Sequence, residues 1–154
     1  MALNLMERVI FLRSTALCGG LPDTALRAIA EVAEERSFDA GERLCVEGEI
    51  GTDMFLLLAG RVEVRVLGST PPRGAAGEAL GRLVATLGPG QSVGEMSVLD
   101  DEPRSATVVA GGRVDALTIH KEDLRDAISL CPDLAFGLFR VLAGRLRAAT
   151  ARPA

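Results

Sequence analysis

The spacing of apolar residues changes twice along the chain, which predicts helices, then strands, then helices again. Near the N-terminus, Leu5, Val9 and Leu12 recur at intervals that place them on one face of a helix. A second helix is expected after Pro22, because proline fits the first turn of a helix. Four apolar residues then share one face of it: Leu26, Ile29, Val32 and Ala33. Residues 1–37 are therefore expected to be helical.

From Phe38 to His120 the apolar residues come in short runs that glycines separate. In one of these runs Val62, Val64 and Val66 alternate with polar neighbours, which is typical of a strand with one buried face. Runs of this kind at intervals of about ten residues predict an antiparallel roll, jelly-roll-like, of about eight strands over residues 38–120. Residues 68–81, rich in glycine, alanine and proline, are expected to form a flexible hairpin loop.

Helical spacing returns at Lys121, where two acids occupy the first turn, as the helix dipole favours. A further helix is expected from Pro132 onward. It carries a stripe of apolar residues: Leu134, Leu138, Val141, Leu142 and Leu146. Helices over residues 121–150, added to those before the roll, give an α+β fold. The chain contains no internal repeat and no linker, so residues 1–154 are expected to form a single domain.

Composition narrows the possible partners of the chain. Its 154 residues are 48% hydrophobic and 25% charged, which suits one globular domain. A net charge of −4 argues against direct binding of nucleic acid, and the longest apolar run, residues 54–60, is too short to insert into a membrane. The only lysine is Lys121, which excludes a phosphate-binding loop ending in Gly-Lys. Three widely separated cysteines favour reduced thiols in the cytoplasm over a disulfide framework.

The segment 94–108, GEMSVLDDEPRSATV, has the composition of an anion site. Gly94 allows the backbone to approach a ligand closely, and Glu95 to Leu99 are expected to form one helical turn whose N–H groups can hold an anion. Arg104 adds a planar set of donors suited to phosphate oxygens. Glu95 can only accept hydrogen bonds, so it would suit the hydroxyl groups of a ligand. Together these residues predict a pocket for a sugar phosphate.

This segment resembles the phosphate-binding cassette of the cyclic nucleotide-binding domains, which occur in catabolite activator proteins, protein kinase A regulatory subunits and cyclic-nucleotide-gated channels. The matching residues form two blocks, Gly94-Glu95-Met96-Ser97-Val98-Leu99 and Pro103-Arg104-Ser105-Ala106-Thr107-Val108. Upstream, FDAGERLCVEGEIGTDMFLLLAGRVEV is similar to the first strands of the family, with glycines at the expected turns: Gly41, Gly48 and Gly60. The resemblance extends from about residue 17 to about residue 146.

The resemblance implies a role for each cassette residue. Glu95 would accept from the ribose 2′-hydroxyl, and Arg104 would pair with the cyclic phosphate. The other predicted ligand-binding residues would line the pocket: Val93, Gly94, Met96, Ser97, Ser105 and Ala106. Val93 stands where the family often has an aromatic residue, and Ser97 where it usually has alanine. Threonine after the arginine favours cGMP in this family, so Ser105 points to cAMP, with cGMP as the other possible ligand. No further cofactor and no metal are predicted.

Some of these residues also have a structural interpretation. Arg104 and Glu95 could pair with each other in a structural ion pair. The acidic segment 99–103 is interpreted as a turn after the short helix, and a metal-binding loop is the alternative. His120, the only histidine, is expected at the start of the helix from Lys121 rather than in catalysis.

The function that the resemblance implies is a regulatory sensor, in which a cyclic nucleotide moves the C-terminal helices. The alternative is a ligand-free structural or interaction domain, and the sequence contains no motif of an enzyme. Phe136, Leu138, Phe139 and Leu142 would belong to the core or to an interface, such as that of a homodimer formed by the C-terminal helix. The sequence ends at Ala154 without room for a helix-turn-helix domain. It is therefore expected to be either a stand-alone module or a segment of a longer protein whose output domain is missing.

Overall fold

The structure is a computed structural model that describes residues 2–67 and 80–151. The chain divides into two compact units, one made of Met1–Ala33 with Glu122–Ala154 and the other of Glu34–Lys121. The first unit is helical and the second is a β-roll. The expectation of a single domain over residues 1–154 stays a prediction.

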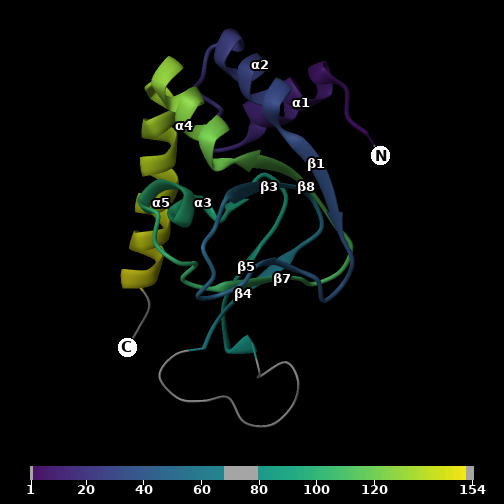
Figure 1. Cartoon of the computed structure of the whole chain (residues 1–154), viewed down its shortest axis with the longest axis vertical. Coiled ribbons are helices and arrows are strands. Elements are labelled where there is room, and N and C mark those ends of the chain that lie inside the picture. Colours follow the sequence, from purple (N-terminus) through teal and green to yellow (C-terminus); the bar gives the residue numbers. More distant parts are fainter. Residues whose placement is uncertain (1, 68–79, 152–154) are drawn as a thin grey trace. The chain divides into compact units, whose positions relative to one another are not determined.

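The roll consists of two antiparallel sheets of four strands each, which confirms the predicted α+β fold and the number of strands. The first sheet has the order β1 (Glu34–Phe38), β8 (Val114–His120), β3 (Asp53–Ala59) and β6 (Ser92–Val93). The second has the order β2 (Arg43–Cys45), β7 (Thr107–Ala110), β4 (Val62–Val66) and β5 (Arg82–Leu87). Figure 1 shows β1, β3 and β8 as one layer and β4, β5 and β7 as the other. The short helix α3 (Glu95–Asp100) lies between β6 and β7 in the sequence.

Apolar side chains from both sheets form the core of the roll. Phe38 on β1 and Phe55 on β3 meet edge to face, with their ring centroids 5.8 Å apart. Val62 is completely buried and Val64 packs against the same cluster, but Glu63, Val64, Arg65 and Val66 are all half-buried, so the alternation predicted for β4 appears only in part. Burial of each such side chain stabilises the fold by roughly 1.5–3 kcal/mol.

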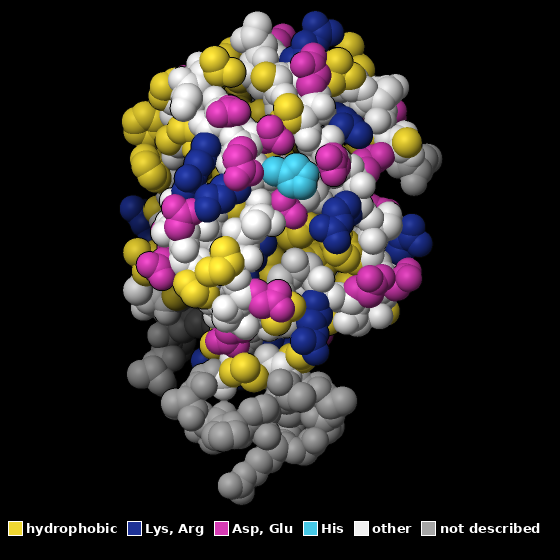
Figure 2. Space-filling model, viewed as in Figure 1, with side chains coloured by type: hydrophobic (Ala, Val, Ile, Leu, Met, Phe, Trp, Pro, Cys, Tyr) yellow, Lys and Arg dark blue, Asp and Glu magenta, His cyan; other side chains and the backbone are white. Residues whose placement is uncertain are grey.

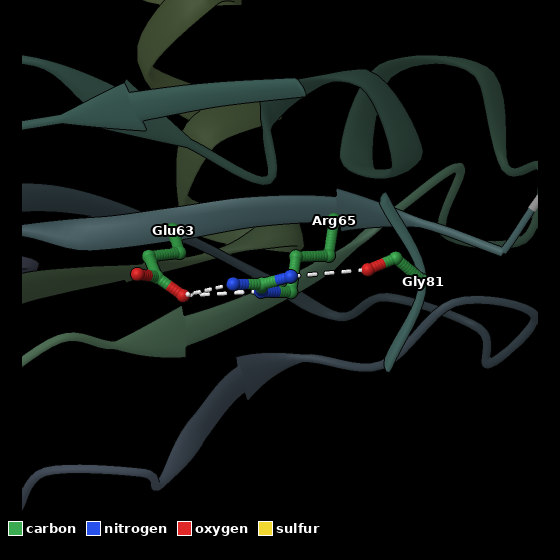
Figure 3. A network of polar contacts seen from close by, with 3 residues as sticks. All are labelled: Glu63, Arg65 and Gly81. Carbon is green, nitrogen blue, oxygen red and sulfur yellow. Dashed lines mark hydrogen bonds and ion pairs between the residues drawn. The ribbon is translucent and has the colours of Figure 1, made fainter. Parts of the chain in front are cut away.

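The β4–β5 hairpin is closed by polar contacts of Arg65 (Figure 3). Its Nε and Nη2 donate to Oε1 of Glu63 on the same strand, at 3.0 and 2.9 Å, and its Nη1 donates to the carbonyl of Gly81 at 3.1 Å. Gly81 has φ 98°, a conformation that glycine adopts without strain, and it immediately precedes β5. The flexible loop predicted for residues 68–81 falls largely on residues 68–79, which lie outside the described residues.

The helical unit contains α1 (Leu5–Ser14), α2 (Asp23–Val32), α5 (Asp133–Thr150) and all but the first residue of α4 (Lys121–Leu130). Asn4 begins α1 with a capping box, in which its side chain accepts from the N–H of Glu7. Gly137 lets α5 approach the backbone of Leu17, because a Cβ at this position would lie 2.1 Å from the Leu17 carbonyl oxygen. Among the described residues no single helix is long and apolar enough to cross a membrane; only α4 and α5 taken together, across a 119° bend, pass that test.

The expected limit of the N-terminal helices was wrong. The helical segment ends at Val32 and β1 begins at Glu34, so residues 34–37 belong to the roll. This strand is short and polar and buries only Phe38, so it has no apolar alternation to reveal it. Val32 and Leu146 are exposed, although the sequence places each of them on the apolar face of its helix. Phe136 and Phe139 are exposed as well, so of the two alternatives expected for them, core or interface, the core does not apply.

Candidate functional site

The short helix α3 sets the geometry of the candidate site. It confirms the helical turn predicted from Glu95, and residues in the left-handed conformation stand at both of its ends. Gly94 precedes it with φ 83°, which glycine adopts freely, and Asp101 follows it with φ 60°. The chain therefore turns sharply into and out of α3, so that the residues on both sides of the helix come close together.

The guanidinium of Arg104 joins the two halves of the cassette. Its Nη1 donates to the carbonyl oxygen of Gly94 at 2.8 Å, and its Nη2 donates to the carbonyl oxygen of Asp53 at 2.7 Å. The residue is only 8% exposed, so this charge lies inside the roll rather than on its surface. The planar arrangement of donors lets one side chain hold two carbonyls at once, which a lysine could not do with the same geometry.

Two glycines leave the space that this guanidinium occupies. A Cβ on Gly51 would lie 2.4 Å from Cζ of Arg104, and a Cβ on Gly94 would lie 2.6 Å from its Nη1. Gly94 also needs its positive φ, whereas Gly51 has no such conformation. The absence of a side chain at Gly51 therefore leaves room for the guanidinium of Arg104, whereas its backbone conformation does not require glycine.

The backbone of Arg104 is held by the loop between β2 and β3. Its N–H donates to the carbonyl of Glu49 at 2.7 Å, and its carbonyl accepts from the N–H of Gly48 at 2.9 Å. An isolated antiparallel bridge between Ile50 and Pro103 lies beside these bonds. The loop thus fixes the main chain of this arginine, while Asp53, the first residue of β3, holds its side chain.

Glu95 places a negative charge in the same region. Its side chain is completely buried, at 0% exposure. The neighbouring thiol of Cys45 is affected by both charges: burial, the largest cause, raises its pKa to about 11, Arg104 lowers the pKa, and Glu95 and Asp53 raise it further. A buried carboxylate and a buried guanidinium therefore act on one small region of the roll, which could hold a group with both an anion and hydroxyls.

The structure brings all eight predicted site residues to this region, in two short segments that Arg104 connects. Val93 and Ser97 are buried, and Gly94 and Ala106 are half-buried. Met96 and Ser105 are exposed. Strand β7 begins at Thr107, so Ser105 and Ala106 lie in the segment just before it. The role of each residue toward a ligand stays a prediction.

Sequence reasoning missed two residues that contact the guanidinium, Gly51 in the β2–β3 loop and Asp53 at the start of β3. Asp53 contributes its backbone carbonyl, which every residue type carries, so its identity gives no signal. Gly51 gave no distinctive signal either, because its burial and its ordinary φ are visible only in the structure. Only the position of Arg104 reveals why it lacks a side chain.

His120 ends β8 immediately before α4, where it was expected, and its ring lies between two carboxylates. Nδ1 contacts Oδ1 of Asp53, and Nε2 is 3.5 Å from Oε1 of Glu34. Figure 2 shows the histidine at the surface with acidic side chains beside it. The hydrogen bond and charge of Asp53 raise the pKa of His120, and Glu34 adds to this. No group of residues suited to a metal ion was found in the described parts of the chain.

The comparison with known families decides the identity of the fold. The model of the family described as "Cyclic nucleotide-binding domain" matches residues 35–131, the roll together with α4. The chain belongs to this family. The resemblance found in the cassette is thereby confirmed, and the domain is of the regulatory, ligand-binding type.

Relatives of different kinds, a transcriptional regulator and an ion channel, contain regions similar to this chain. A CRP-like cAMP-activated global transcriptional regulator of Mycobacterium tuberculosis is 29% identical over 128 residues, which cover 83% of this chain and 54% of the regulator. A cyclic nucleotide-gated potassium channel of Mesorhizobium japonicum is 33% identical over 152 residues, which cover 95% of this chain and 38% of the channel. The chain thus spans about half the length of the first of these relatives and less of the second.

The fold is also that of a solved member of the family. The crystal structure of a cyclic nucleotide-binding domain from Methylobacillus flagellatus superposes with a TM-score of 0.75 at 25% sequence identity, covering 94% of this chain and 79% of that one.

Proposed function

We propose that this chain is a sensor that binds a cyclic nucleotide, cAMP in the first place, and responds by moving its C-terminal helices. One observation carries the proposal: the guanidinium of Arg104 is buried beside α3, within a region that also contains the fully buried carboxylate of Glu95. One positive and one negative group suit a ligand that has a single phosphate charge and a free hydroxyl. A cyclic nucleotide has this composition.

Arg104 would bind the phosphate without giving up its place in the roll. A guanidinium has five N–H donors, more than the carbonyls of Gly94 and Asp53 require, so it can also donate to phosphate oxygens. The N–H groups at the start of α3 would add donors on the other side. Glu95 would accept from the ribose hydroxyl, and Val93, Gly94, Met96, Ser97, Ser105 and Ala106 would line the pocket.

Two observations support cAMP over cGMP. The residue after the arginine is Ser105 rather than the threonine that favours cGMP in this family. The mycobacterial relative is described as cAMP-activated. The chain would act as a binding module without enzymatic activity, and its output would lie in the movement of α4 and α5 or in a partner.

Thermal unfolding tests the proposal directly. At one hundred times its Kd a ligand stabilises the folded state by about 2.7 kcal/mol, which corresponds to a rise in Tm of roughly 5–10 °C for a chain of this size. We expect this rise with cAMP, a smaller one with cGMP, and none with cAMP for the Arg104→Ala variant. The proposal fails if neither nucleotide changes the Tm of the wild-type chain at millimolar concentration.

A protein-interaction domain without ligand is the second candidate, favoured by the exposed aromatic pair on α5. Phe136 and Phe139 are each 60% exposed and meet edge to face, with their centroids 6.0 Å apart. Large apolar side chains that gather on a surface are typical of protein contacts. Unchanged melting with both nucleotides, together with a dimer by light scattering, would favour this function over the first.

A further inference from the structure

Asp101, at the C-terminal end of α3, has an unusual backbone conformation. Among the described residues it is the one residue other than glycine with a positive φ, 60°. Its N–H donates to the carbonyl of Ser97 at 3.1 Å, which closes the helix. The left-handed region disfavours side chains with a Cβ, although aspartate tolerates it better than most. Glycine would end α3 with less strain, so we ask which contact of the Asp101 carboxylate favours aspartate at this position.

The carboxylate of Asp101 contacts the ammonium group of Lys121. Nζ of Lys121 pairs with Oδ1 of Asp101, and the lysine side chain is only 20% exposed. The backbone N–H of Lys121 donates to the carbonyl of Thr52 at 2.8 Å. Thr52 directly precedes Asp53, whose carbonyl holds Arg104. Lys121 thus contacts both the end of α3, through its side chain, and Thr52 beside Asp53, through its backbone N–H.

Lys121 is also the first residue of α4. The roll ends at this residue, and the chain continues from it into the C-terminal helices. We propose that the Asp101–Lys121 ion pair couples α3 to the start of α4, with Lys121 as a positioning residue for the cassette. The part of this inference that concerns a ligand rests on the proposed function, whereas the coupling itself exists without any ligand.

The pair differs from an ordinary surface ion pair, which contributes little to stability because two mobile side chains must be held together. Here both partners are held by their own backbones: Lys121 through its bond to Thr52, and Asp101 through the helix end. The neighbouring acid Asp100 has another task, since its Oδ1 accepts from the N–H of Glu102 at 3.0 Å within the turn. A shift of α3 would therefore be transmitted to Lys121, the first residue of α4, through its ion pair with Asp101.

Hydrogen–deuterium exchange of the full chain without nucleotide tests the coupling. We expect Lys121→Gln and Asp101→Asn each to raise amide exchange in residues 95–101 and at the start of α4, by roughly two- to five-fold, the range of a partly exposed ion pair. Asp101→Gly should do the same, because it keeps the left-handed backbone and removes only the carboxylate. The double variant Asp101→Asn/Lys121→Gln should exchange no faster than either single variant, because both changes remove one interaction.

Two matched controls and a ligand measurement complete the test. Lys121→Arg keeps the charge, and Glu102→Gln changes an exposed acid of the same turn, so both should exchange like the wild type. With cAMP as the probe, Lys121→Gln should reduce the change in protection that the ligand causes in α4. Failure of wild-type binding would refute the proposed function alone. Wild-type exchange in Lys121→Gln and Asp101→Asn, or additive effects in the double variant, would overturn the coupling.

Discussion

Arg104 donates from its guanidinium to the backbone carbonyl of Asp53, 2.7 Å away, although the two residues are 51 positions apart in the sequence. This bond joins the cassette to the start of β3, and it holds the charge of Arg104 inside the roll. A site that is organised in advance needs less ordering when the ligand binds, so less of the interaction energy is lost. The consequences for binding can be tested residue by residue.

Arg104→Ala should weaken cAMP binding by roughly 2–5 kcal/mol, because it removes the positive partner of a desolvated phosphate and leaves the charge of Glu95 in place. Isothermal titration with cAMP measures the change. Arg43→Ala, which removes an exposed arginine of the same roll, serves as the control and should bind like the wild type. Wild-type affinity in Arg104→Ala would show that the arginine does not meet the phosphate.

Glu95→Ala should cost less than Arg104→Ala, because it removes hydroxyl bonds and also a repulsion toward the phosphate. A comparison of cAMP with its 2′-deoxy analogue isolates the hydroxyl bond. The wild-type chain should prefer cAMP by roughly 1.5–3 kcal/mol, the value of a hydrogen bond to a charged group. In Glu95→Ala the two ligands should bind alike. If the variant keeps the full preference for cAMP, another group recognises the 2′-hydroxyl.

Gly51→Val should reduce cAMP affinity nearly as far as Arg104→Ala does, because its side chain would occupy the space of the guanidinium. The same substitution added to Arg104→Ala should have no further effect on affinity, since the group it displaces is already gone. Gly112→Ala is the matched control: a Cβ there meets nothing within 4 Å. An independent loss of affinity in the double variant would mean that Gly51 acts by another route.

The pKa of His120 is raised above its ordinary value of 6.5 by Asp53 first and Glu34 second, so folding favours the protonated ring. The stabilisation is therefore fully present below about pH 6.5 and is lost as the pH rises through the higher pKa of the folded state. Urea unfolding as a function of pH should show the wild type losing its advantage over His120→Gln across this window. A constant difference between the two proteins from pH 6 to 9 would contradict the assignment.

Cys45 and Cys18 should resist thiol reagents, since burial raises the pKa of each to about 11 and keeps the thiol neutral. Cys131 is half-buried and should react first. Labelling followed by peptide mass spectrometry at pH 8 measures the order, and Cys131→Ser should remove the fast phase. Fast labelling of Cys45 in the folded chain would show that the roll opens near the site.

The cassette could be predicted from the sequence because its chemistry is contiguous. Gly94, Glu95 and Arg104 lie within eleven residues, and a conformationally free residue, an acceptor and a planar cation are each chemically distinctive. The eight-stranded roll was also predictable, since short apolar runs with glycine between them indicate strands. Strand β1 was missed because five residues with one buried side chain carry no period.

The sequence by itself indicated the fold class, through the spacing of its apolar residues, and a candidate site, through the chemistry of Gly94, Glu95 and Arg104. The other predicted pocket residues rest on the family resemblance of the cassette. Tertiary structure alone decided what surrounds Arg104: the carbonyl of Asp53 and the missing Cβ of Gly51 come from another part of the chain. It also decided which of three consecutive acids, Asp100, Asp101 and Glu102, reaches Lys121. Such contacts depend on how distant segments pack and on a single backbone angle, and neither leaves a periodic signal in the sequence.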